Sequence, residues 1–163
     1  MESACTATSC RGFESHSLSA TDTSVLQMTK QSADHSTLHG MIERLPELVN
    51  HDAVLVRRGR YLCLDILIEI GAVPYYVSIA AGRIARLDRG PLLMRSWALA
   101  FRGPEDAWRQ FWQPFPPPHF HDIFALAKSG QFRIEGDVHP LMANLLYFKD
   151  MLAAPRRLAE EAR

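Results

Sequence analysis

The spacing of hydrophobic and polar positions changes sharply within residues 130–152, in the stretch GQFRIEGDVHPLMANLLYFKDML. Phe132 and Ile134 alternate with polar neighbours, which predicts a short strand with this apolar pair on one face. A glycine ends the strand, and Asp137 follows where an N-cap carboxylate accepts the free N–H groups of a helix. Pro140 falls in the first helical turn, where its missing N–H group costs least. The pattern therefore predicts a strand, a tight turn and a closing helix.

The predicted closing helix is more apolar than a surface helix requires. One stripe at helical spacing is formed by Leu141, Leu145, Phe148 and Leu152. Four further side chains, Met142, Leu146, Tyr147 and Met151, widen it beyond the arc of about 100° that packs on a core. Three explanations of this excess are open: the helix closes a ligand pocket, it docks on a membrane or partner, or it is simply buried.

The strand, the Gly-Asp turn and the closing helix resemble the C-terminal signature of the sterol carrier protein type 2 family. The residues that carry the resemblance are Ser129, Gly130, Phe132, Arg133, Ile134, Glu135, Gly136 and Asp137, followed by Leu141, Met142 and Leu145. With the predicted hairpins upstream it spans residues 38–152. The sequence departs from the family pattern at His139, Pro140 and Asn144 and at the prolines of residues 116–118. The resemblance implies a domain that holds lipids between a sheet and helices.

Alternating apolar positions predict a largely antiparallel sheet upstream of the closing region. The expected strands are residues 61–70, 73–80, 83–87 and 93–101. Short connections that contain Gly71 and Gly82 join the first three strands as hairpins. In the fourth strand, Trp97, Leu99 and Phe101 are expected to share one face.

Helical spacing appears in three places before the last strand. Residues 38–50 form the first predicted helix, with Pro46 as a position that kinks or splits it. A second helix opens after Gly103-Pro104 and turns Ala107, Trp108, Phe111 and Trp112 inward. A proline-rich link then leads to a short helix over residues 121–128. The sum is an α+β fold: a meander of four strands, these helices, and a fifth strand, in which a mostly antiparallel five-stranded sheet is covered on one face by helices.

Composition limits the class of protein further. A chain of 163 residues with 47% hydrophobic residues is long enough for one globular domain. The 18 basic and 18 acidic residues leave no net charge, which argues against a nucleic-acid partner. We expect residues 1–36, rich in Ser, Thr and Ala, to be a flexible head, residues 37–155 to be the domain, and residues 156–163 to be a tail. The head does not read as a secretory signal, and a reduced Cys63 suits a cytoplasmic protein.

No residue pattern points to catalysis or to a metal. His119 and His121 point apart on a helix, and His121 or the neighbouring Asp122 suits a helix start instead. Asp65 and Glu69 lie on the polar side of a strand, where carboxylates are more often solvated than catalytic. We therefore expect no catalytic residue, no metal, no cofactor and no enzymatic activity.

The residues left for function are apolar. Those that can line a space between sheet and helices are Leu64, Ile66, Ile68, Tyr75, Val77, Trp97, Leu99, Trp108, Phe111, Trp112, Phe124, Leu141, Met142, Leu145 and Phe148. They either fill that space at ordinary packing density or, as the resemblance implies, surround a cavity of about 300–1,000 Å³.

The expected function is non-enzymatic binding and carrying of a hydrophobic ligand, a sterol, fatty acyl group or isoprenoid lipid, in an apolar cavity between sheet and helices. Tryptophans near its mouth, with the closing helix as a gate, would make transient contact with a membrane or a partner enzyme. The alternative is an accessory scaffold that presents a lipid or quinone-like substrate to partner enzymes.

Overall fold

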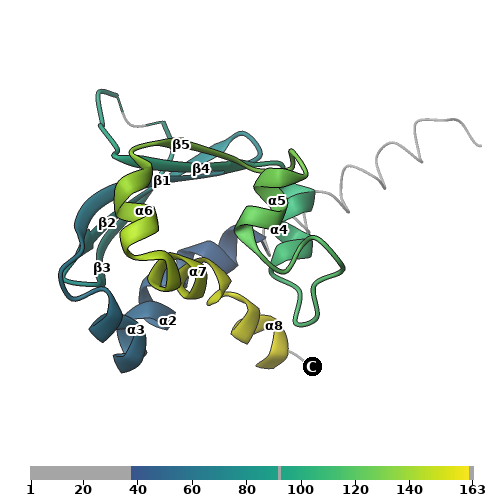
Figure 1. Ribbon diagram of the computed structural model, residues 1–163, viewed down its shortest axis with the longest axis horizontal. Helices are drawn as coiled ribbons and strands as arrows, with labels where there is room; N and C mark the ends of the chain where they lie inside the picture. The colour runs from purple at the N-terminus through teal and green to yellow at the C-terminus, as the bar shows by residue number, and fades with distance from the viewer. Residues whose placement is uncertain (1–37, 92, 162–163) are drawn as a thin grey trace, which may run out of the picture. The chain divides into compact units, whose positions relative to one another are not determined.

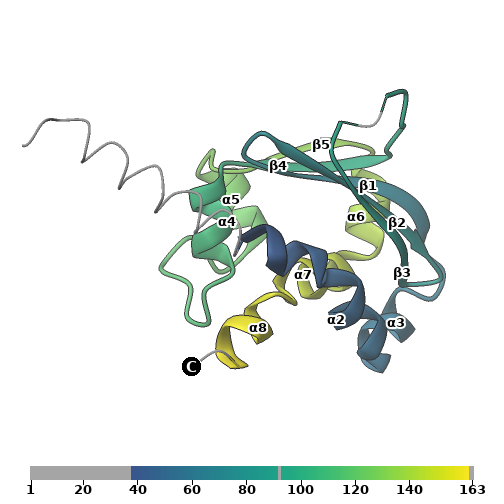
Figure 2. The same ribbon diagram turned by 180° about the vertical axis from the view of Figure 1, so that it is seen from behind.

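A five-stranded sheet with helices packed on one face organises the protein (Figures 1 and 2). The computed structural model describes residues 38–91 and 93–161, so the predicted head of residues 1–36 lies outside the described residues. The strands are β1 (Cys63–Ile70), β2 (Val73–Ala80), β3 (Arg83–Arg89), β4 (Leu99–Gly103) and β5 (Arg133–Gly136). The helices are α2 (Leu45–His51), α3 (Ala53–Arg58), α4 (Glu105–Phe111), α5 (Ile123–Lys128), α6 (Val138–Ala143), α7 (Leu145–Ala153) and α8 (Arg156–Glu161). The predicted α+β class, with a mostly antiparallel sheet, is confirmed.

The strand order is β3-β2-β1-β4-β5, which corrects the predicted meander of four strands. The first three strands pair as antiparallel hairpins. The fourth strand, however, lies on the far side of β1 and pairs with it in parallel, with Ile66 opposite Leu99. A parallel pair needs a crossover connection instead of a tight turn. Strand β5 then closes the edge antiparallel to β4.

The crossover between β3 and β4 runs over the face of the sheet opposite to the helices, here called the outer face. Arg95 in this segment donates hydrogen bonds to Ser78 at 2.8 Å and to Asp88 at 3.1 Å. The N–H group of Ala98 donates to the backbone oxygen of Asp65 at 2.8 Å. These contacts hold the crossover segment outside the β4 ladder, so strand β4 starts only at Leu99. The predicted strand start at residue 93 is wrong.

Two predicted helices are each divided in two. The first, expected over residues 38–50, breaks at Arg44, and α2 begins with Pro46 in its first turn, where proline is tolerated. The closing helix breaks at Asn144, whose backbone (φ −123°, ψ 36°) leaves the helical region. Residues 156–163, expected to be a tail, include helix α8. No helix among the described residues is long and apolar enough to cross a membrane.

Aspartates cap three of the short helices. Asp137 accepts a hydrogen bond from the N–H group of His139 at 2.9 Å, as the sequence predicted. Asp122 accepts one from Phe124 at 3.1 Å, which selects Asp122 over His121 as the cap of α5. Asp52 caps α3 in the same way, through the N–H groups of Val54 and Leu55. Satisfying these otherwise unpaired donors sets where each helix begins.

Gly136 holds the turn between β5 and α6 in a conformation that only glycine adopts readily. Its φ is +97°, and a Cβ atom there would lie 2.3 Å from the backbone oxygen of Ala98. Gly130 has a comparable φ of +76° but open space around the same position. Both glycines therefore require a positive φ, but only at Gly136 would a side chain also clash with a neighbouring backbone.

We expect Gly136→Ala to destabilise the protein more than Gly130→Ala. The control variant meets only the left-handed backbone cost of about 1–2 kcal/mol. The Gly136 variant adds a backbone clash, which we expect to lower the free energy of unfolding by a further 1–3 kcal/mol, roughly. Urea unfolding of both variants measures the difference; equal losses would contradict the close approach of Ala98 to Gly136.

Candidate functional site

The inner face of the sheet supplies one wall of the candidate site. Its central positions carry apolar side chains, as the strand alternation predicted: Ile66, Ile68, Tyr75, Val77 and Leu99 are completely buried. Leu64, nearer the strand end, is partly buried against the same core. In register, Ile66 lies opposite both Val77 and Leu99, so these side chains share one continuous surface. This surface faces the helices.

Aromatic side chains of α4 and of Trp112, the residue that follows it, cover this wall. Trp108, Phe111 and Trp112 are buried, and the ring centroid of Trp108 lies 4.4 Å from that of Phe132 and 5.1 Å from that of Trp112. The indole N–H of Trp108 donates to the backbone oxygen of Glu69 in β1 at 3.0 Å. Phe132 was predicted to lie on an apolar strand face but was not predicted to line the site. The aromatic cluster fixes α4 to the sheet.

The closing helices α6 and α7 form the opposite wall. Leu141 and Phe148 are buried there, and the Phe148 ring lies 6.2 Å from that of Phe101 in β4. Leu145 is only partly buried. Met142 points outward with 57% of its surface exposed. The predicted stripe of Leu141, Leu145, Phe148 and Leu152 therefore faces the interior, whereas the outward position of Met142 corrects its place among the predicted lining residues.

Two further predicted residues lie at the margins or outside. Phe124 on α5 is partly buried against the core. Trp97 is not on the same face as Leu99, which corrects that prediction: its ring lies 5.8 Å from the guanidinium of Arg102, a residue of the outer face. Strand alternation does not apply to Trp97 because it belongs to the crossover and precedes β4.

The polar groups inside this apolar interior are already hydrogen-bonded. The hydroxyl of Tyr75 shares a hydrogen bond of 2.6 Å with Nδ1 of His39, and the hydroxyl of Tyr147 donates to the backbone oxygen of Gly82 at 3.0 Å. Burial raises the pKa of each tyrosine to about 12, so both phenols keep their protons. The Trp112 indole donates to the backbone oxygen of Leu152 at 2.8 Å. The sequence alone carried no signal that paired His39 with Tyr75.

Two surface hollows are lined by residues outside the predicted set. The larger, about 570 Å³, lies among α2, α3 and α8 and is lined by Arg44, Glu47, Leu48, His51, Asp52, Ala53, Val54 and Arg157. The smaller, about 330 Å³, is lined by Gln113, Pro114, Phe115 and Ala159. Charged side chains border the larger hollow, which therefore does not suit an apolar ligand.

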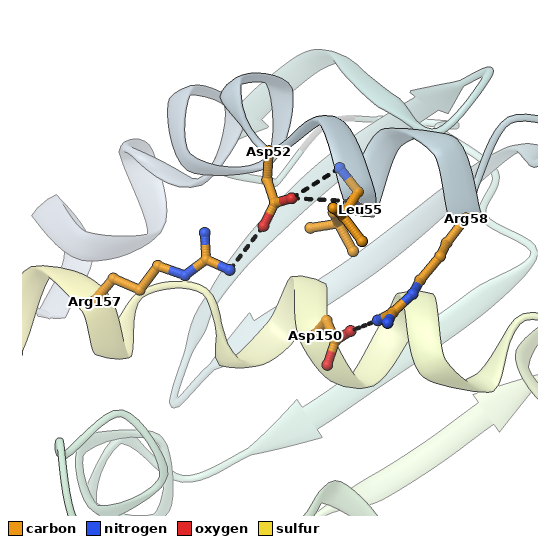
Figure 3. A network of polar contacts seen from close by, with 6 residues as sticks. Asp52, Leu55, Arg58, Asp150 and Arg157 are labelled. Atoms are coloured by element: carbon orange, nitrogen blue, oxygen red, sulfur yellow. Dashed lines mark hydrogen bonds and ion pairs between the residues drawn. The ribbon is translucent and has the colours of Figure 1, made fainter.

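Two ion pairs join α3 to the C-terminal helices, as Figure 3 shows. Arg58 pairs with Asp150 of α7, and Arg157 of α8 pairs with Asp52 at 2.7 Å. The same Asp52 side chain caps α3 through Leu55. The hydrogen bond from Arg157 holds the pKa of Asp52 below its ordinary value of 3.8. One carboxylate thus connects two segments of the helical layer.

The residues considered for catalysis or metal binding occupy structural positions. Asp122 caps α5 and pairs with Lys149 at 2.6 Å. Glu69 pairs with Arg102 on the outer face, and Asp65 lies 4.0 Å from Arg95. In residues 38–91 and 93–161, no three His, Cys, Asp or Glu side chains gather as metal ligands would.

Comparison with solved structures identifies the fold. The chain superposes on a conserved hypothetical protein from Thermus thermophilus that is named as a possible sterol carrier protein. The TM-score is 0.59, with 7% identity over 74% of this chain and 87% of that one. It superposes on sterol carrier protein 2 with a TM-score of 0.58 and 8% identity over 72% of this chain and 94% of that one.

The protein therefore has the fold of sterol carrier protein 2, in agreement with the resemblance at its C-terminus. Neither the protein-family models nor the curated sequences include a match to this chain. At identities of 7% and 8%, the likeness concerns the fold and not the residues of a site.

We expect Asp52→Ala to destabilise the protein more than Asp52→Asn, because asparagine keeps the cap of α3 and loses only the charge opposite Arg157. Loss of the cap costs about 0.5–2 kcal/mol, whereas an exposed ion pair contributes up to about 1 kcal/mol. Since the folded-state pKa is lowered, the unfolded chain binds the proton more readily, and the stabilising charge effect is lost as the pH falls below 3.8. Urea unfolding over that pH range should show the gap between wild type and Asp52→Asn closing. A gap that stays constant would contradict the ion-pair role.

Proposed function

We propose that this protein binds and carries a hydrophobic ligand in the interior between the sheet and helices α4, α6 and α7, without transforming it chemically. The observation that carries the proposal is the set of buried apolar side chains on facing walls, from Ile66 and Ile68 to Trp108 and Leu141, in a chain with the fold of sterol carrier protein 2. Removing apolar ligand surface from water supplies about 25 cal/mol per Å². A sterol, fatty acyl chain or isoprenoid has such a surface.

Helix α6 is the segment best suited to admit the ligand. It has six residues, and Leu141 is its one buried side chain. Its ends are defined by the Asp137 cap and by the break at Asn144, so it is set off from α7. A short helix with one buried side chain opens at lower cost than α4, in which Ala107, Trp108 and Phe111 are buried. We infer that the ligand enters as α6 moves away from the sheet. The apolar part of the ligand then contacts both walls.

Selectivity for the ligand should be loose. The hydroxyls of Tyr75 and Tyr147 and the indole N–H groups of Trp108 and Trp112 all have protein partners. A ligand therefore meets apolar side chains more than free donors or acceptors, and recognition follows length and shape. This accounts for a carrier that accepts several lipid classes better than for an enzyme, which must place polar groups against a reacting bond.

We expect the delipidated protein to bind a fluorescent fatty acid saturably at micromolar concentration and to become more resistant to urea when it does, since a ligand that binds only the folded state stabilises it. Leu141→Ala should destabilise the protein by about 2–5 kcal/mol and accelerate fatty acid uptake, because it removes the contact that holds α6. Stopped-flow fluorescence measures the rate.

The matched control is Leu126→Ala, which removes an equally buried leucine from α5. It should cost comparable stability without accelerating uptake. Equal acceleration by both variants would contradict entry at α6. A folded protein that never binds the fatty acid, or releases no lipid in native mass spectrometry after gentle purification, would argue against the carrier function itself.

The scaffold role stays a prediction, and the outward position of Met142 and Leu146 on α6 and α7 gives it a specific surface. A scaffold would form a stable complex with a partner enzyme in size-exclusion chromatography while the delipidated protein fails to take up fatty acid. A carrier would show the uptake, with or without the complex.

A further inference from the structure

Five large hydrophobic side chains are exposed near the end of the sheet where β4 begins and β5 ends. They are Leu93 and Met94 in the crossover, 96% and 102% exposed, and Val138, Met142 and Leu146 on α6 and α7, 45%, 57% and 63% exposed. Eight large hydrophobic residues in the described part of the chain are exposed in this way, so most of them belong to this group. We call these five residues the apolar edge. Both ribbon views place the crossover loop and α6 at the same end of the sheet (Figures 1 and 2).

The two parts of the apolar edge are joined directly. The N–H group of Asp137, the cap of α6, donates to the backbone oxygen of Ala98 in the crossover at 2.7 Å. A Cβ atom on Gly136 would lie 3.0 Å from the ring of Trp97, so that ring packs closely on the turn into α6. Val138 and Met142 lie four residues apart on α6, the spacing of neighbours along a helix, and Leu146 follows in the first turn of α7. The crossover and the start of α6 are therefore attached to each other.

The base of the loop is held in place. Arg95, next to Met94, pairs with Asp88 at 3.1 Å, donates to Ser78 at 2.8 Å and lies 6.0 Å from the ring of Tyr76. Met94 itself has a φ of +58°, which a residue with a side chain rarely adopts. These contacts anchor Arg95 to the sheet, while the side chains of Leu93 and Met94 are exposed to water. Exposed apolar side chains on an anchored loop favour contact with an apolar phase.

We propose that the apolar edge docks on the surface of a lipid bilayer and inserts Leu93, Met94, Met142 and Leu146 among the acyl chains. The inference rests on the proposed function, because a carrier must exchange its ligand with a membrane. Five side chains fall well short of the roughly 20–30 residues that each side of a stable protein interface contributes. None of the five side chains is a Trp, Tyr or Arg, the types that dominate such interfaces, whereas flexible Leu and Met side chains suit a fluid phase.

The attraction is apolar and not electrostatic. The arginines near this end already pair with carboxylates: Arg95 with Asp88, Arg102 with Glu69 and Glu135, and Arg133 with Glu135. They therefore add little net charge toward anionic headgroups. Binding should consequently occur on zwitterionic membranes and should not depend on salt, since screening weakens only charge interactions.

The test is co-sedimentation of the full chain with phosphatidylcholine vesicles. Wild type should sediment with the vesicles, and its partition coefficient should stay within about twofold when salt rises tenfold. The combined change Leu93→Ser with Met94→Ser, and separately Met142→Ser with Leu146→Ser, should each lower the coefficient at least tenfold, roughly, because exposed side chains contribute little to folding but much to insertion. Phe115→Ser is the matched control: it removes a side chain that is 80% exposed in the proline-rich segment and should leave the coefficient unchanged.

Several results would overturn the proposal: no sedimentation of wild type, binding only to vesicles with phosphatidylglycerol that salt abolishes, or folded variants that bind like wild type. A dimer in analytical ultracentrifugation that the same variants dissociate would assign the edge to a second copy of this chain instead. Fatty acid uptake measured without vesicles separates the two proposals. If uptake persists while vesicle binding fails, only the docking surface is wrong; if uptake itself fails, the carrier function is wrong.

Discussion

The sheet has one face that cannot be left in water, and the packing of Trp108 on it organises the helical layer. The ring lies against Phe132 and Trp112, and its N–H group binds the backbone of β1 at Glu69. The neighbouring Trp112 binds the backbone of Leu152 in α7. One pair of tryptophans thus connects the sheet, α4 and the closing helices. Burying large aromatic surface while satisfying each indole N–H group makes this arrangement both stable and specific.

The same satisfaction of polar groups shapes the proposed site. Because the tyrosine hydroxyls and indoles of the interior already have protein partners, an apolar ligand competes mainly with side-chain packing, not with hydrogen bonding. In the proposed carrier, ligand entry then depends on how easily a wall moves. Helix α6, in which Leu141 is the one buried side chain, is the part of that wall with the least buried apolar surface. The proposed function therefore assigns the stability of the core and access to it to different helices.

The closing region resolves the excess of apolar residues in its sequence by facing two ways. Leu141 and Phe148 turn inward, whereas Met142 and Leu146 remain exposed. The hydrogen bond from the Asp137 cap to Ala98 attaches the start of α6 to the crossover. An apolar helix in this protein is thus neither entirely core nor entirely surface. The same short segment, α6 and α7, therefore contacts the protein interior on one side and the solvent on the other.

Local chemistry in the sequence was sufficient for the strand alternation of β1 and β2, the cap at Asp137 and the α+β class, because periodicity and capping act over a few residues. Most residues that were predicted to line a site are therefore buried or partly buried in the core, and their role in ligand binding stays a prediction. The parallel position of β4, the outer-face placement of Trp97 and the pairing of Asp52 with Arg157, 105 residues apart, were decided by tertiary structure. Such choices depend on which distant surfaces bury and pair best once the chain is folded, and no local pattern records that competition.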